Sequence, residues 1–301
     1  MLSRFFGSGD GWSRALREAN PWATRIIDDA AASPAILTGS DFLQARREAS
    51  HTRLRSGPVA LNTWAIAMNL IRPEPHGPNA DLWQALACMD LQGGEFMRGC
   101  DFTGYIFPGR IDFRTSRFAT TAYFQSAKFS GVADFSGVIF DEDAYFEHAR
   151  FLEVAVFDDC RFRRTGQFRN VMFEADCSFE RAHFLRDCWF RDGVFDGRSR
   201  FGGAIFESDC SLGRSRFSGD ASFHAAQFKD TTSFDSSTFH GRVDFSAAQF
   251  SRKVFMDNAR FKRAVDFSNT VFRGEIVLTG VEAADESTGT DIRLLNDRRS
   301  G

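Results

Sequence analysis

The sequence predicts a β-solenoid that follows a small, mainly helical N-terminal region. Three observations lead to this fold class: phenylalanine recurs at spacings of five and six residues, a small residue lies two positions before almost every one of these sites, and residues 1–90 differ in composition from the rest. We therefore expect residues 1–90 to form a helical region with a cap, residues 91–280 the solenoid, and residues 281–301 a C-terminal tail or second cap.

The phenylalanine spacing defines an 11-residue double unit. Starting from Phe102, every site up to position 278 is Phe except Leu212, Met256 and Leu278, which are also apolar. A helical stripe would need spacings of three and four, and strands this short, without Asn-Gly loops, make poor hairpins. The remaining architecture is a solenoid of stacked coils, because neighbouring coils together bury rings that no single coil can bury.

The residue two positions before each site is almost always small, with Ile111 and Tyr105 as bulky exceptions. Two apolar residues at this separation point to the same side of a short extended segment, so we expect both to face the interior. Five cysteines occupy the small position, where a reduced thiol behaves as a small hydrophobe: Cys100, Cys160, Cys177, Cys188 and Cys210. The last two lie one coil apart and should be stacked neighbours, both reduced in the cytoplasm.

These units resemble those of the pentapeptide repeat family, in which a small residue, a polar residue and a central Leu or Phe are followed by two polar positions. The segments ADFSGVIF (133–140), CRFRRTGQF (160–168) and AQFSRKVF (248–255) carry the likeness. The resemblance implies a right-handed quadrilateral parallel β-helix with four faces per coil. Because every second unit has one extra residue, the coil grows from 20 to 22 residues, and we expect a bulge at alternate corners to hold the addition. Residues 102–278 then form about eight coils.

The residue just before each interior site faces outward, and the 22-residue register places every fourth such residue on one face. One of these columns contains three aromatic residues, Tyr123, Tyr145 and Trp189, within four coils. They are either a stack that stabilises the coils, as like residues on adjacent strands do, or a surface covered by the N-terminal segment, or a partner-binding ladder, since aromatic residues are enriched at protein interfaces. The sequence leaves these interpretations open.

Residues 1–90 hold six of the seven prolines and four of the five tryptophans, but only three of the 35 phenylalanines. Capping preferences predict helices over residues 13–19, 21–32, 41–50, 58–71 and 80–88, with Asn20, Ser40 and Asn79 at three of the starts. A solenoid needs a cover over its open end, and we expect five residues to provide it: Leu82, Trp83, Leu86, Ala87 and Met89. A membrane-surface helix or a partner-binding domain is the alternative role for this region.

At the other end, the register stops at Leu278. Beyond it, Ile292, Leu294 and Leu295 either cap the last coil or join two rods end to end. The resemblance implies the second arrangement, a homodimer through the C-terminal end, for some members of the family.

The most apolar stretch of the chain, residues 59–71, is shorter than the roughly 20 residues that a membrane span requires. It also contains Asn62 and Asn69. A basic segment, an apolar run and a small-residue cleavage site do not follow one another near Met1. We therefore expect a cytoplasmic protein without a membrane span.

Motifs for chemistry are absent from the sequence. It has no Cys-x-x-Cys pair, His-Glu-x-x-His run, Gly-x-Ser-x-Gly elbow or phosphate-binding Gly-Lys-Ser run. The carboxylates of Asp141, Glu142 and Asp143 lack the spacing of a calcium loop, and the histidines are scattered. We expect no catalytic residues, no metal and no cofactor.

Two classes of function remain. The first is a non-enzymatic structural or protein–protein interaction scaffold with an unidentified protein partner. The alternative, which the family resemblance implies, is a DNA-mimicking inhibitor or protector of DNA gyrase of the quinolone-resistance type. Mimicry of duplex DNA needs a strongly negative surface, whereas the whole chain carries a net charge of only −3. Because a dominant basic patch is also absent, we expect no direct binding of nucleic acid and favour the scaffold.

Overall fold

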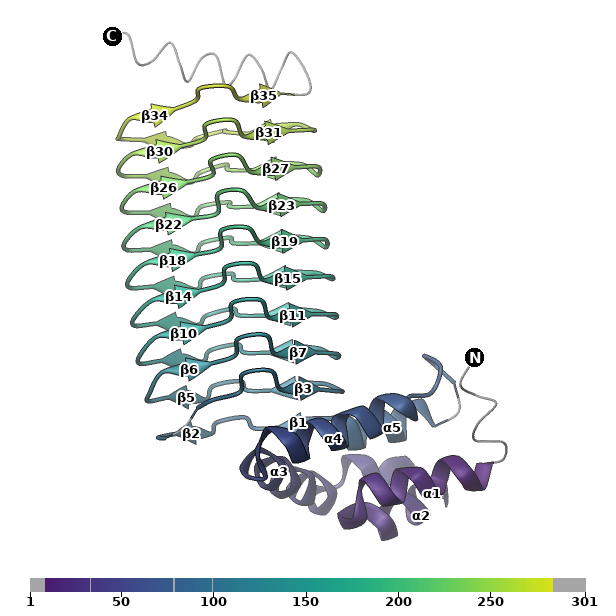
Figure 1. The fold of residues 1–301 in the computed structure, drawn as a ribbon. Helices are drawn as coiled ribbons and strands as arrows, with labels where there is room; N and C mark the ends of the chain where they lie inside the picture. Colours follow the sequence, from purple (N-terminus) through teal and green to yellow (C-terminus); the bar gives the residue numbers. More distant parts are fainter. Residues whose placement is uncertain (1–8, 33, 78, 99, 284–301) are drawn as a thin grey trace.

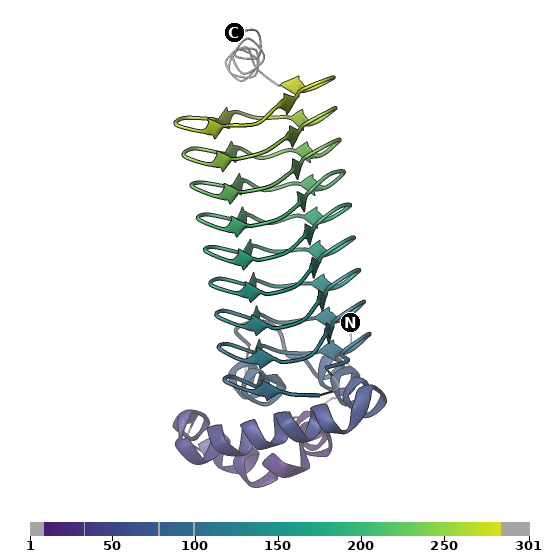
Figure 2. The ribbon, with the colours of Figure 1, turned by 90° about the vertical axis from the view of Figure 1, so that its left-hand side faces the viewer.

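The computed structural model describes residues 9–32, 34–77, 79–98 and 100–283. It shows a rod of stacked coils with helices gathered at one end (Figure 1). A view turned by 90° shows coils of similar outline along the rod (Figure 2). Three of the four sheets in the described part contain nine strands, so the rod has about nine turns. The sequence predicted about eight because the count began at Phe102, whereas the first strand begins at Met89.

The helical region contains α1 (Gly9–Ala19), the 3₁₀ turns η2 (Pro21–Ala23) and η3 (Pro34–Thr38), α2 (Thr24–Ala32), α3 (Ser40–Arg55), α4 (Gly57–Leu70) and α5 (Ala80–Ala87). All five predicted helices are present. The segment predicted as one helix over residues 21–32 begins as a 3₁₀ turn, closed by a bond from Thr24 N to Pro21 O. The cap of α3 is Gly39 rather than Ser40, which is the first helical residue.

The rod consists of parallel two-residue strands in four sheets, which we name A to D. Sheet A contains β1 (Met89–Asp90), β4 (Ile111–Asp112), β8 (Ala133–Asp134), β12 (Ala155–Val156), β16 (Cys177–Ser178), β20 (Ser199–Arg200), β24 (Ala221–Ser222), β28 (Val243–Asp244) and β32 (Val265–Asp266). Sheet B contains β2 (Glu95–Phe96), β5 (Arg117–Phe118), β9 (Ile139–Phe140), β13 (Arg161–Phe162), β17 (His183–Phe184), β21 (Ile205–Phe206), β25 (Gln227–Phe228), β29 (Gln249–Phe250) and β33 (Val271–Phe272).

Sheet C contains β6 (Ala122–Tyr123), β10 (Ala144–Tyr145), β14 (Gly166–Gln167), β18 (Cys188–Trp189), β22 (Cys210–Ser211), β26 (Thr232–Ser233), β30 (Val254–Phe255) and β34 (Ile276–Val277). Sheet D contains β3 (Ile106–Phe107), β7 (Lys128–Phe129), β11 (Arg150–Phe151), β15 (Met172–Phe173), β19 (Val194–Phe195), β23 (Arg216–Phe217), β27 (Thr238–Phe239), β31 (Arg260–Phe261) and β35 (Glu282–Ala283). Each residue pairs with the one 22 positions further on, for example Ala144 with Gly166.

The interior is filled by the phenylalanine rings, as the spacing predicts. Along one column, the centroids of Phe146 and Phe168 lie 4.9 Å apart with ring planes 2° from parallel. Rings of neighbouring columns meet edge to face, as Phe146 and Phe157 do at 5.4 Å and 89°. Both arrangements are favourable for aromatic quadrupoles. The substitute Leu212 is equally buried, so the core is continuous through the coils where a ring is missing.

The extra residue of every second unit lies at alternate corners, as expected. Three residues separate β5 from β6, and they include the addition between Phe118 and Ala122. The strand ladders pass these corners without a change of register. The longer unit therefore alters the corners and leaves the pairing intact.

The other corners require a left-handed backbone conformation. Every eleventh residue from Gly93 to Gly280 has a positive φ, and most of these residues are not Gly; Ala225 and Ala247 are examples, at 55° and 57°. At Ala225, the turn is closed by a bond of 3.0 Å from Ala226 N to Phe223 O. A positive φ at the third position is the mark of a type II turn, in which Gly is preferred because it has no Cβ.

Replacing Ala225 with Gly should therefore raise the free energy of unfolding by about 0.5–1 kcal/mol, because the left-handed conformation strains an L-residue by more than the added flexibility of Gly costs. Urea denaturation measures the change. The neighbouring Ala226→Gly variant is the control, because Ala226 is buried and has no positive φ. It should lose stability, and a loss in Ala225→Gly as well would contradict the turn assignment.

The helices α3 and α4 cover the first coil. Leu61 of α4 belongs to the same hydrophobic core as the rings, and Leu54 and Trp64 pack against it. The expected cover is only partly right. Met89 belongs to the solenoid core and Ala87 packs against Gly109 of the first coil. Trp83 and Leu86 are instead buried in a separate core among the helices, with Leu82 packed against it. The chain connectivity explains this position of α5. Only one residue separates the end of α5 from β1, so the helix lies beside the first coil and cannot lie across its open end. In the described helices, none has the length and apolar composition needed to cross a bilayer.

Side chains of the helices also satisfy the open backbone edge of the first coil. The Asn62 side chain donates from Nδ2 to Gly104 O at 2.9 Å and accepts from Ile106 N at 2.8 Å. The Ser50 hydroxyl accepts from Asp90 N at 3.0 Å. These backbone groups have no preceding coil to pair with, so the side chains take the place of a missing strand.

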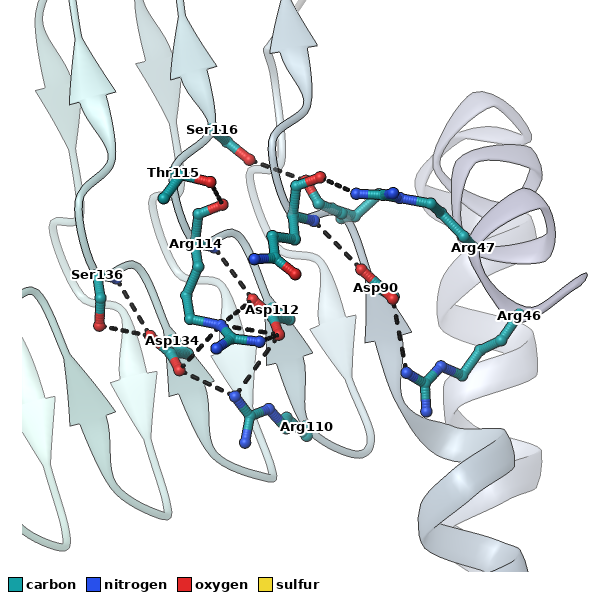
Figure 3. A network of polar contacts seen from close by, with 12 residues as sticks. Arg46, Arg47, Asp90, Arg110, Asp112, Arg114, Thr115, Ser116, Asp134 and Ser136 are labelled. Carbon is teal, nitrogen blue, oxygen red and sulfur yellow. Dashed lines mark hydrogen bonds and ion pairs between the residues drawn. The ribbon is translucent and has the colours of Figure 1, made fainter. Parts of the chain in front are cut away.

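A network of arginines and aspartates joins the helices to sheet A (Figure 3). Arg46 lies 3.5 Å from Asp90, and Arg47 donates to Gln92 O. Further along, Asp112 pairs with Arg114 at 2.6 Å. Burial would raise the pKa of Asp112, but the hydrogen bonds and charge of Arg114 lower it on balance. The network thus compensates the like charges that sheet A places on adjacent strands.

Candidate functional site on sheet C

The outward column of sheet C contains the predicted ladder residues in the expected register. Tyr123 pairs with Tyr145, Tyr145 with Gln167, and Gln167 with Trp189. The column continues through Ser211, Ser233, Phe255 and Val277. The three aromatic residues therefore share one face, but Gln167 separates the two tyrosines from Trp189.

The two tyrosines form a stacked pair. Their ring centroids lie 5.4 Å apart and their planes differ by 8°. The Tyr145 hydroxyl donates to Asp143 Oδ2 at 3.5 Å, and its pKa is raised by burial and by the nearby Asp143 carboxylate. Tyr123 remains 39% exposed. This geometry is what a stabilising cross-strand pair requires.

Trp189 instead borders a groove of about 470 Å³ that extends toward the C-terminal coils. Phe255 forms the opposite end, three coils or about 14 Å away at the usual strand spacing. Ser211 and Ser233 lie between the two rings in the same column. Two large outward rings separated by two small residues leave a depression, which we call the sheet C groove. The 22-residue register also puts Phe255 in this column, but nothing in the sequence connects it to Trp189.

Both rings of the groove already contact a cation. The Arg169 guanidinium, from the preceding coil, lies 5.4 Å from the Trp189 ring centroid, and Lys253 Nζ lies 4.8 Å from that of Phe255. Such contacts are favourable because the ring face is electronegative. Since Arg169 approaches from the N-terminal side, the side of Trp189 toward Ser211 remains for a ligand.

Carboxylates lie in the groove and near it. Asp235 and Asp257 line it, with Arg191 3.6 Å from Asp235. Asp209 precedes the groove residues Cys210 and Ser211 in the chain but does not itself line the groove. Burial together with the charges of Asp230 and Asp187 raises the pKa of Asp209. A carboxyl with a raised pKa lacks a full counter-charge, so this surface favours a bound cation.

One hydroxyl of the groove is left without a partner. Ser211 is only 4% exposed, and its Oγ has no hydrogen-bond partner within the described residues. The neighbouring Ser233 hydroxyl donates to Asp235. A buried polar group without a partner costs free energy, so a ligand atom that bonds Ser211 would gain from it.

The cysteines face the interior, as predicted. Cys188 pairs with Cys210 on the next strand of sheet C, and both are free thiols. Burial raises the pKa of Cys188, which disfavours a reactive thiolate. In the residues that the structure describes, no group of three or more His, Cys, Asp or Glu side chains is placed to hold a metal ion.

Sheet A has an outward column with aspartates near both of its ends. Asp90, Asp112 and Asp134 begin it, but Val156, Ser178, Arg200 and Ser222 follow before two further aspartates. Arg110 and Arg114 pair with Asp134 and Asp112. The continuous negative stripe that the gyrase alternative needs is therefore not found in this column.

The rod, with its four parallel sheets and inward rings, defines a β-solenoid protein. A family model described as pentapeptide repeats (9 copies) matches five overlapping stretches, residues 102–150, 124–171, 146–194, 168–216 and 201–249. The chain is a pentapeptide repeat protein, as the resemblance of its units implied. A comparison with curated proteins finds no match. The pentapeptide-repeat solenoid supports a scaffold or interaction role.

Proposed function

We propose that this protein is a non-enzymatic scaffold that binds a protein partner along sheet C, and that the sheet C groove receives a cationic segment of that partner. The observation that carries the proposal is the groove itself. It has two aromatic rings at its ends, a Ser211 hydroxyl between them that has no partner among the described residues, and the carboxylates of Asp235 and Asp257 in its lining. Lysine and arginine side chains fit such a site because they bind both ring faces and carboxylates.

Within the predicted ladder, the proposal assigns different roles to the residues. Trp189 contacts the partner, whereas Tyr123 and Tyr145 stabilise the coils by stacking on each other. Two of the three interpretations that the sequence left open, the stabilising stack and the partner-binding ladder, therefore apply to different parts of the same column. A cytoplasmic location remains a prediction. Dimerisation through Ile292, Leu294 and Leu295 also remains one, and these residues lie outside the described part of the chain.

Titration with short peptides tests the proposal. A peptide alternating lysine and leucine should bind, a peptide with glutamate in place of lysine should not, and binding should weaken with salt. Trp189→Ser and Phe255→Ser should each reduce affinity by about tenfold, because truncating an aromatic anchor removes most of the local binding energy.

The tyrosine pair provides the matched control. Tyr123→Ser should leave the peptide affinity unchanged while lowering the free energy of unfolding by about 1 kcal/mol, the size of a stacked pair. Equal binding of the glutamate peptide, or an equal loss of affinity in Tyr123→Ser and Trp189→Ser, would contradict the proposal.

A further inference from the structure

A pocket in the helical region contains an arginine that forms no ion pair with any described carboxylate. The pocket has a volume of about 460 Å³ and lies among η2, α3 and α4. Its walls are mostly apolar, and Trp22, Arg53 and Trp64 are its largest side chains. Pockets of this composition, with a few polar groups among apolar walls, are typical of sites for small ligands.

The Arg53 guanidinium lies between two indole rings. Its Cζ is 3.9 Å from the ring centroid of Trp64 and 5.8 Å from that of Trp22. Nη2 donates to the side-chain oxygen of Asn20 at 2.7 Å. Nη1 is buried without a hydrogen-bond partner, and none of the described aspartates or glutamates forms an ion pair with Arg53.

Three other arginines of the helical region form ion pairs with carboxylates, whereas Arg14, Arg47, Arg55 and Arg72 form none with the described residues. Arg17 lies 2.5 Å from Asp28, and Arg46 lies 3.5 Å from Asp90. Burial lowers the pKa of Arg53 to about 10, the direction expected when a buried charge has no opposite charge beside it. A second donor, Nε1 of the lining residue Trp22, is also buried and has no partner among the described residues. The pocket thus combines an uncompensated positive charge with two unused donors.

The geometry points to a binding site for a carboxylate that carries an apolar body. We propose that the carboxylate pairs with Arg53 and Trp22 Nε1 while its apolar part lies against the apolar wall that includes Ala45 and Ala49. A carboxylate has the single charge and two acceptor oxygens that a guanidinium binds best. A phosphate fits less well, because the walls are apolar and the exposed Glu48 at the rim repels a dianion.

Two sources share this chemistry: a free aromatic or aliphatic acid, and the C-terminal carboxylate of a peptide that ends in an apolar residue. The two donor nitrogens, Arg53 Nη1 and Trp22 Nε1, have almost no solvent-exposed surface. Binding therefore requires the Trp22 ring to turn, and tryptophan fluorescence should report this movement.

Isothermal titration calorimetry with phenylacetate tests the proposal, and phenylacetamide serves as its uncharged isostere. Phenylacetate should bind with a dissociation constant on the order of 1 mM and change the fluorescence, whereas phenylacetamide should do neither. A hexapeptide ending in Phe, with a free or an amidated C-terminus, distinguishes the sources: tighter binding of the free-acid peptide than of phenylacetate indicates a peptide ligand, and the reverse indicates a small acid.

Three variants test the assignment of the residues. Arg53→Gln should weaken phenylacetate binding by about tenfold, and Trp22→Phe, which keeps a ring and removes only the donor, should weaken it by about threefold. Glu48→Gln should strengthen binding at low salt, because it removes a like charge from the rim. Equal binding of phenylacetamide, stronger binding of inorganic phosphate, or unchanged affinity in a folded Trp22→Phe variant would overturn the proposal.

Discussion

Replacing Phe168 with Ala should lower the free energy of unfolding by about 3–5 kcal/mol, the cost of a large cavity in a packed core. The ring of Phe168 lies between those of Phe146 and Phe190 at 4.9 and 4.7 Å and meets Phe179 edge to face at 5.5 Å. In a solenoid each coil contacts only its neighbours, so the loss affects both interfaces of the coil. Urea denaturation followed by circular dichroism measures it.

Phe168→Leu is the matched control for this cavity. Leu212 occupies the equivalent position two coils further on and is fully buried, so the column accepts leucine, and this variant should lose less than about 1.5 kcal/mol. Phe272, which is only partly buried near the end of the rod, should also tolerate Ala better. A loss in Phe168→Ala no larger than that in Phe272→Ala would contradict the assignment of Phe168 to a continuous core.

Replacing Asn20 with Ala should destabilise the helical region by about 2–4 kcal/mol. Asn20 is 0% exposed, and its side-chain oxygen accepts from Arg53 Nη2 at 2.7 Å and from Trp64 Nε1 at 3.3 Å. It also donates to Leu16 O at 3.0 Å. Its loss leaves a buried guanidinium with no acceptor at all, which costs more than an ordinary hydrogen bond.

Tryptophan fluorescence during urea denaturation measures this loss, since four of the five tryptophans lie in residues 1–90. Asn69→Ala is the control, because Asn69 lies within α4, where Ala is the better helix former. Asn69→Ala should change the free energy of unfolding by no more than about 0.5 kcal/mol. If Asn20→Ala and Asn69→Ala lower the free energy of unfolding by similar amounts, the contacts of Asn20 do not stabilise the helical region.

The solenoid could be predicted because the residue pattern that specifies it is short and is repeated in every coil. Each coil buries the same two positions, so a ring such as Phe168 and a substitute such as Leu212 identify the interior without knowledge of any neighbour. The left-handed corners could not be found in this way, because Ala225 and Ala247 occupy positions where composition alone would suggest glycine.

The cover of the first coil and the two candidate sites depend on contacts between distant parts of the chain. Asn62 gives no sign in the sequence that its side chain will replace a strand, and Trp83 is as apolar as Leu61 but faces a different core. For the sheet C groove, the register placed Trp189 and Phe255 in one column. Only the structure shows how deep the space between them is.

Hydrogen–deuterium exchange of the protein with and without the lysine–leucine peptide tests the proposed docking surface most directly. Bound peptide should slow amide exchange in residues 208–213 and 230–236, which include the floor and sides of the sheet C groove. Amide exchange in residues 117–123, around the stacked Tyr123, should not change; we call this segment the tyrosine end. Protection confined to the tyrosine end, or spread equally over sheets A and B, would contradict the account.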